Sequence, residues 1–279
     1  MNWQQKVWRG GRCLVYSVTP LILYLFVPGL AMNIGKFIRR YRFSNQSFAS
    51  ESGNFYTFVS LLAVAWFLYR QSTKEGSTIW EDTTFDLSPL RNSRSERKFA
   101  VVCVMFGFST SLLLSSLLTL IPFPSWLMDS YRSNTRLAFE GRDLILVLLN
   151  IGFLAPTLEE ILFRGYMLNR QMTFFTEKQS IGITSVIFAL CHVSPLWMIY
   201  SFLMGVLLAK ISIRKDNLLP AVCIHIGFNL PSVLIAVIQS VNGGNQNVFG
   251  SPILILLYGA IGAVSARLLL LEMKGAMDI

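Results

Sequence analysis

The sequence predicts an all-α, polytopic membrane protein with about eight transmembrane helices. Hydrophobic residues make up 53% of the 279 residues, and charged residues only 14%. Soluble domains carry about 25% charged residues, so this chain lacks the groups that cover a water-facing surface. The apolar residues also gather in runs, several of which approach the ~20 residues that a transmembrane helix needs. We therefore expect a chain that crosses the bilayer several times.

Eight apolar runs supply the candidate helices. The first run follows three basic residues, but no small-residue cleavage site comes after it, which favours a retained span over a signal peptide. The run at 181–194 is short and is joined through Pro195 to the next run, so these two runs are expected to form a shallow hairpin. The runs are 13–34, 55–69, 99–121, 143–168, 181–194, 196–213, 219–239 and 251–271.

Polar linkers at 35–54, 70–98 and 122–142 separate the earlier runs. None of these linkers is long and apolar enough to form a separate soluble domain. We divide the chain into N-terminal transmembrane segments of unclear role (1–142), a core that carries the polar residues discussed below (143–239), and a C-terminal transmembrane helix (240–279).

The formal net charge of +9 does not indicate nucleic-acid binding. The Lys and Arg residues flank the apolar runs, as the positive-inside pattern requires, and no basic stripe is interleaved with aromatic residues. With eight spans, basic residues are more numerous inside if both termini lie in the cytoplasm. We therefore expect a multi-pass protein of the cell membrane, in contact with the lipid bilayer and oriented N-in and C-in.

Ionisable side chains inside the apolar runs point to a functional site. Each costs about 2.5–3.5 kcal/mol at the centre of a bilayer even on lenient scales, so such residues mark function by default. Glu159 and Glu160 are adjacent, and Glu160 and Arg164 are spaced i, i+4, which suits an ion pair on one helix. Glu159 points about 100° away and has no such partner. It is therefore the carboxylate expected to bind a water molecule.

Both histidines of the chain also lie in apolar runs. His192 alone would be typical of a buried residue that hydrogen-bonds a neighbouring helix. His225 and Asn229 are spaced i, i+4, and Gly227 between them allows another backbone to approach closely. Counting residues from the helix ends places Glu159 at the same depth as these three residues.

A cysteine nucleophile fits this pattern less well. The four cysteines lie in apolar runs without CxxC spacing and are expected to be packing residues: Cys13, Cys103, Cys191 and Cys223. Cys191 and His192 are sequence neighbours, so their side chains diverge on a helix.

Together these residues resemble the motif set of the CPBP family of CAAX proteases and bacteriocin-processing enzymes. The family pattern EExxxR, FxxxH and HxxxN is met, in order, by Glu159-Glu160…Arg164, Phe188…His192 and His225…Asn229. The resemblance covers about a third of the chain, 143–239. It implies an eight-span intramembrane endopeptidase of all-helical fold.

The resemblance also implies roles for the matching residues. Glu159 would be the general base that activates water, and His192 would orient that water or carry its proton. His225 and Asn229 would stabilise the oxyanion. Glu160, Arg164 and Phe188 would support the site structurally.

Several alternatives remain open at this point. We favour a metal-free site, but Glu159, His192 and His225 are enough ligands for a catalytic zinc ion. The substrate would be a peptide or a membrane-associated protein, with or without a prenyl group. The alternative functions are a non-catalytic scaffold or bacteriocin-immunity protein, and a proton-coupled transporter, because buried Glu and His residues also form proton relays.

Overall fold

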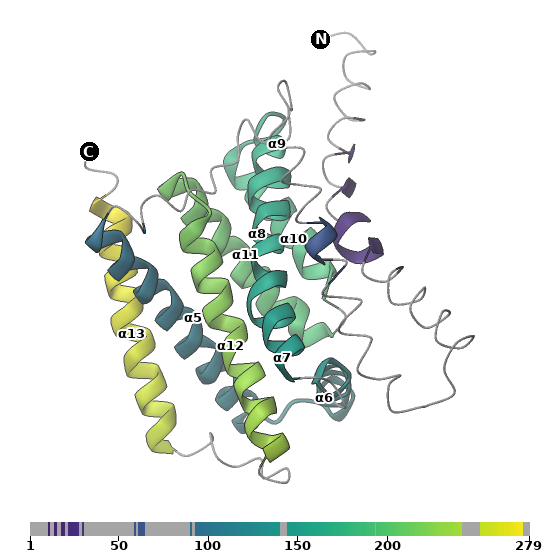
Figure 1. Ribbon diagram of the computed structural model, residues 1–279, viewed down its shortest axis with the longest axis vertical. Coiled ribbons are helices and arrows are strands. Elements are labelled where there is room, and N and C mark those ends of the chain that lie inside the picture. Colours follow the sequence, from purple (N-terminus) through teal and green to yellow (C-terminus); the bar gives the residue numbers. More distant parts are fainter. Residues whose placement is uncertain are drawn as a thin grey trace.

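The computed structural model describes residues 93–139, 144–192, 194–241 and 252–275, together with scattered residues before position 93. All regular secondary structure in these residues is helical, which confirms the all-α prediction for them (Figure 1). The predicted runs at 13–34 and 55–69 and the linkers at 35–54 and 70–98 lie largely outside the described residues. The exceptions include a short π-helical turn, η1 (Ile22–Phe26).

Four of the described helices are long and apolar enough to cross a membrane, which supports a membrane protein. A further helix, Leu219–Val241, has 23 residues and is apolar over its fully described part, Leu219–Ile235. The predicted number of about eight spans is therefore not reached in the part of the chain that is described. The four spans are Arg94–Leu118, Leu144–Met172, Pro195–Lys215 and Pro252–Lys274.

The second span is one continuous helix that changes from α-helical to π-helical hydrogen bonding twice. Its segments are α7 (Leu144–Val147), η2 (Leu148–Leu154), α8 (Ala155–Glu160), η3 (Ile161–Leu168) and α9 (Asn169–Met172). The segments η2 and η3 are π-helical and flank α8, which begins at Ala155-Pro156. Because Pro156 has no N–H to donate, the regular ladder is interrupted there. Glu159 and Glu160 thus lie between two π-helical segments, a feature that is frequent at functional sites.

The helices α10 (Glu177–Leu190) and α11 (Pro195–Lys215) form a packed pair joined by a short turn. The α10 helix has 14 residues. At 1.5 Å per residue it is about 21 Å long, too short for a hydrocarbon core of about 30 Å. The pair packs tightly where a Cβ atom on Gly205 would lie 2.9 Å from the Cβ of Ser185. The hairpin predicted for 181–194 is therefore present, with His192 in its turn.

Two glycines bring α5 (Arg94–Leu120) and α12 (Leu219–Val241) into backbone contact. A Cβ atom on Gly107 would lie 2.0 Å from the carbonyl oxygen of Ile224, and one on Gly227 would lie 2.2 Å from that of Val104. The close approach expected at Gly227 is confirmed. Because Gly227 lies between His225 and Asn229, this crossing fixes the part of α12 that carries both polar side chains.

The last helix, α13 (Pro252–Gly275), packs on the other side of α5 from this region (Figure 1). Near its end, Glu272 forms an ion pair of 3.5 Å with Lys215 at the end of α11. The Lys215 ammonium also lies 4.4 Å from the centre of the Phe99 ring, near the start of α5. The start of α5 and the ends of α11 and α13 therefore share one end of the bundle.

The polar linker expected at 122–142 is wrong for most of its length, because Ser125–Phe139 forms helix α6. This helix is amphipathic: Leu127 and Tyr131 are half-buried, while Trp126 and Arg132 are exposed. The Tyr131 ring contacts the ring of Trp197 on α11 edge-on, with the centroids 6.5 Å apart. The sequence prediction missed this helix because it looked for apolar runs, and an amphipathic helix this polar does not form one.

We expect Gly227→Ala to destabilise the protein, because the new methyl group would meet the backbone of α5 rather than a side chain that could move. Overpacking of this kind costs about 1–3 kcal/mol, and more where backbone must shift. Gly259→Ala is the matched control, because nothing lies within 4 Å of a Cβ atom there. Thermal unfolding in detergent should show a lower midpoint for Gly227→Ala only. Equal midpoints for both variants would contradict the close crossing.

Candidate active site

The two adjacent carboxylates are buried inside the bundle. Glu159 is 5% exposed and Glu160 is fully buried, on the last turn of α8. Their surroundings are apolar: Leu158 and Leu162 pack in the same cluster as Phe163. A carboxylate in such surroundings is stable only if it is paired with a cation or well hydrogen-bonded. The partners of these two residues therefore define the site.

Arg164 is the first partner of Glu160. Its Nη1 donates to Glu160 Oε1 at 2.9 Å, and both side chains are fully buried. This is the i, i+4 ion pair predicted from the sequence, and the prediction is confirmed. The guanidinium also lies 4.3 Å from the centre of the Phe188 ring, a distance at which a cation is attracted to an aromatic face.

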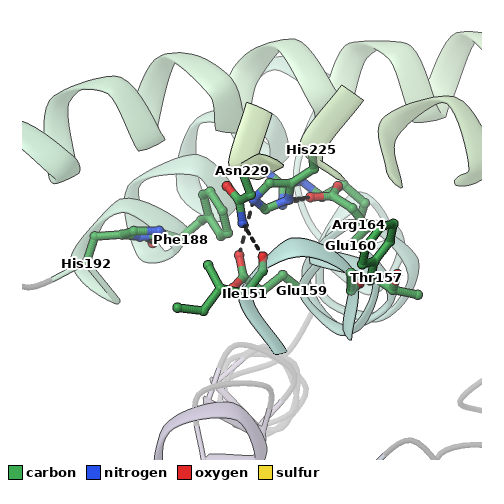
Figure 2. A network of polar contacts seen from close by, with 10 residues as sticks. Ile151, Thr157, Glu159, Glu160, Arg164, Phe188, His192, His225 and Asn229 are labelled. Carbon is green, nitrogen blue, oxygen red and sulfur yellow. Dashed lines mark hydrogen bonds and ion pairs between the residues drawn. The ribbon is translucent and has the colours of Figure 1, made fainter. Parts of the chain in front are cut away.

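His225 from α12 contacts both carboxylates (Figure 2). Its Nδ1 lies 2.7 Å from Glu160 Oε1, and its Nε2 lies 3.6 Å from Glu159 Oε2. The expectation that Glu159 lacks an ionic partner was wrong, because it considered only residues on the same helix. The partner comes from α12, a helix distant from Glu159 along the chain.

The hydrogen bond to Glu160 determines how the imidazole of His225 can act. An ionised carboxylate only accepts hydrogen bonds, so His225 Nδ1 carries a hydrogen and donates a hydrogen bond to Glu160. The other ring nitrogen, Nε2, faces Glu159. When His225 is doubly protonated, the cluster contains two negative charges (Glu159 and Glu160) and two positive charges (Arg164 and His225). It is then electrically neutral, as a buried group of charges needs to be.

Phe188 lies at the centre of the aromatic contacts. Its ring centroid is 5.0 Å from that of His192, 5.9 Å from that of His225 and 5.1 Å from that of Phe163. Figure 2 shows Phe188 between the two histidines. The support role expected for Phe188 stays a prediction, and these contacts favour it, because one ring touches both imidazoles.

His192 lies in the α10–α11 turn, beyond the Phe188 ring from His225 (Figure 2). Its Nδ1 is 3.0 Å from the carbonyl oxygen of Phe188. A carbonyl only accepts, so Nδ1 is the protonated nitrogen and Nε2 keeps a lone pair. The Nε2 of His192 is therefore able to accept a proton or a hydrogen bond.

Asn229 follows His225 by one helical turn. Its Nδ2 donates to the carbonyl oxygen of Ile151 in η2 at 2.9 Å. An amide nitrogen has two hydrogens, so a second donor remains on Asn229. The contact with Ile151 was not foreseen, because a backbone carbonyl carries no signal in the sequence. In the sequence, the nearest sign of an irregular backbone in this region is Pro156, which interrupts the hydrogen-bond ladder of the second span after Ile151.

The structure thus brings together Glu159, Glu160, Arg164, Phe188 and His225 directly. Of the two remaining predicted residues, Asn229 lies beside His225 within this group, and His192 lies at its edge beyond Phe188 (Figure 2). Cys191 takes no part, because its Sγ donates to Ile187 O at 3.3 Å on its own helix.

The three possible zinc ligands, Glu159, His192 and His225, do not surround a common point in this arrangement. Within the described residues, no three His, Cys, Asp or Glu side chains converge closely enough to hold a metal ion. His225 uses its Nδ1 on Glu160, and Phe188 stands between His225 and His192. A catalytic zinc ion needs three protein ligands around one point.

We expect Arg164→Met to destabilise the protein strongly, because it leaves Glu160 buried without its guanidinium. Removing one partner of a buried ion pair costs about 3–5 kcal/mol. Glu272→Gln is the control, because the Glu272 side chain is 46% exposed and an ion pair with such an exposed partner contributes about 0–1 kcal/mol. Unfolding in detergent should separate the two variants. The double variant Glu160→Gln/Arg164→Met should lose less than the sum of its single changes. Additive losses would contradict a coupled pair.

One comparison with known proteins found a match. Residues 141–231 match the family model of type II CAAX prenyl endopeptidases, Rce1-like. No curated protein and no solved structure is similar enough to this chain to count as a match. The matched segment contains all seven residues of the three motifs, from Glu159 to Asn229. The resemblance to the CPBP family is therefore confirmed, since over residues 141–231 this chain matches its Rce1-like type II CAAX prenyl endopeptidases.

Proposed function

We propose that this protein is an intramembrane endopeptidase that cleaves a peptide or the C-terminal region of a membrane-associated protein. The family match supports a CAAX-type intramembrane protease at the family level. The observation that carries the proposal is the contact of one imidazole, His225, with two buried carboxylates beside a buried arginine. Stability alone does not favour such a cluster, since replacing buried charges by apolar residues is often neutral or stabilising.

In this proposal Glu159 is the general base. It takes a proton from a water molecule while the water oxygen attacks the carbonyl carbon of the scissile peptide bond. The protonated Glu159 then passes this proton to the leaving nitrogen as the C–N bond breaks. His192 assists through Nε2, which has a lone pair because Nδ1 donates to Phe188 O.

His225 and Asn229 stabilise the oxyanion of the tetrahedral intermediate. With Nδ1 bound to Glu160, His225 donates to the oxyanion through Nε2 as an imidazolium. Asn229 contributes the N–H that does not bind Ile151 O. Donors fixed in advance by the protein are worth the most to catalysis.

Glu160 and Arg164 act on the reaction through His225. Glu160 accepts hydrogen bonds from both Arg164 and His225 at the same oxygen, so it fixes the imidazole's orientation. In this respect it resembles the carboxylate that orients the histidine of a serine protease triad.

The substrate lies in or at the membrane, with or without a prenyl group. We further propose that both termini are cytoplasmic. Support comes from the shared position of the basic ends of α11 and α13, joined by Lys215–Glu272, because basic residues accumulate on the cytoplasmic side. Nucleic acid is not a partner in this proposal.

Glu159→Gln should abolish cleavage while the protein still folds, because the amide cannot accept a proton. Loss of a general base costs about 10²–10⁴-fold in rate. The assay is cleavage of a panel of prenylated and unprenylated peptides by purified protein. Glu177→Gln is the control, since Glu177 is exposed on α10 and far along the helix from the site. Cleavage retained in Glu159→Gln would refute the proposed base.

We propose that the reaction needs no metal, and we expect cleavage to persist in chelator. The disposition of Glu159, His192 and His225 supports this, because they do not surround one point. A zinc-dependent peptidase assayed in the same detergent serves as the positive control for chelation. Loss of activity that zinc restores would overturn this part of the proposal and leave the peptidase assignment standing.

A further inference from the structure

Four polar side chains lie fully buried along the contact between η3–α9 and α10. Their exposed fractions are at most 1%, although the surrounding residues, such as Met167 and Leu168, are apolar. We call these four residues the polar seam: Arg164, Gln171, Ser180 and Thr184. Buried polar groups in a membrane protein are costly, so a row of four calls for an explanation.

The seam runs from one end of α10 toward the candidate active site. Ser180, Thr184 and Phe188 are spaced i, i+4 and share one face of α10. Across the contact, Thr184 Oγ1 donates to Gln171 Oε1 at 2.9 Å, and the Phe188 ring lies under the Arg164 guanidinium. The next polar group beyond Arg164 is Glu160, which contacts His225.

Hydrogen-bonding capacity remains along this path. Within the described part of the chain, no hydrogen-bond partner meets Ser180 Oγ, Arg164 Nε, Arg164 Nη2 or Glu160 Oε2. An unsatisfied buried group costs about 1–3 kcal/mol, and more when it is charged. Groups of this kind in folded proteins are normally satisfied by internal water.

Two buried hydroxyls elsewhere in the bundle behave differently. Ser116 and Ser212 donate to carbonyl oxygens of their own helices, at 2.8 and 2.9 Å. A hydroxyl bonded in this way needs no further partner. Outside the seam, Ser185 Oγ and Ser194 Oγ are also buried without a hydrogen-bond partner among the described residues, so the seam is distinguished by its row of groups rather than by one such hydroxyl.

The outer end of the seam is water-facing. Glu177, Lys178 and Gln179 are exposed, and Ser180 follows them directly. The turn before α10 also marks the end of the span Leu144–Met172. A polar path thus leads from the membrane surface to carboxylates that are otherwise enclosed by apolar side chains.

We propose that the polar seam is the route by which water reaches the candidate active site. This inference rests on the proposed function, because hydrolysis consumes one water molecule for each peptide bond cleaved. Ser180 and the Thr184–Gln171 pair form hydrogen bonds with the passing water, and Arg164 with Glu160 receives it at the site.

The test replaces the central hydroxyl without changing its shape, by Thr184→Val. Cleavage should slow by about tenfold, the effect of losing one hydrogen bond on the route, with little change in KM. Ser212→Ala is the matched control, because its hydroxyl is buried and bonded to its own helix. Equal slowing in both variants would overturn the proposal.

A second measurement detects buried water directly and does not depend on peptidase activity. X-ray pulses generate hydroxyl radicals from water, and these oxidise side chains that adjoin it, including buried ones. In Glu159→Gln protein, Met167 and Phe188 should be oxidised, and adding Thr184→Val should reduce this oxidation while adding Ser212→Ala should not. If the protein cleaves its substrate but Met167 and Phe188 are not oxidised, the water route is refuted while the proposed function stands. Labelled residues in a protein that cleaves no peptide would support the route and count against the proposed function.

Discussion

The charge balance of one buried cluster constrains the rest of this structure. Two carboxylates, a guanidinium and an imidazole share a small apolar volume, and none of them is well solvated there. Each charge is tolerated only because its neighbours compensate it. The helices that carry these groups, the second span and α12, must therefore be held in a fixed relation to each other.

Two local features of the chain maintain that relation. The π-helical segments on either side of α8 change the pitch of the second span around Glu159 and Glu160. The glycine crossing with α5 holds α12 where His225 is placed. Asn229 ties α12 to η2 one turn further along. Backbone geometry, rather than a dense set of side-chain bonds, thus positions the reactive groups.

Much of the candidate site was predictable because its signal is chemical. Charged residues in apolar runs are conspicuous, and the i, i+4 spacing of Glu160 and Arg164 directly implied their ion pair. The contact of His225 with both carboxylates was not predictable, since it depends on how two distant helices pack. The same holds for the Ile151 carbonyl, which has no side-chain signature. Helix α6 was missed because its amphipathic period lies in a segment too polar to resemble a span.

The contact between α5 and α12 has a consequence for how a substrate enters. Where two backbones touch at Gly107 and Gly227, no side chains remain between them that could change rotamer and open a gap. These two helices therefore form a rigid wall on one side of the active site. The opposite side is bounded by the short α10 helix and its turn, which interdigitate through side chains such as Phe188. If the proposed function holds, a peptide would enter on that side, where rotation of side chains is enough to make an opening and the backbones need not separate.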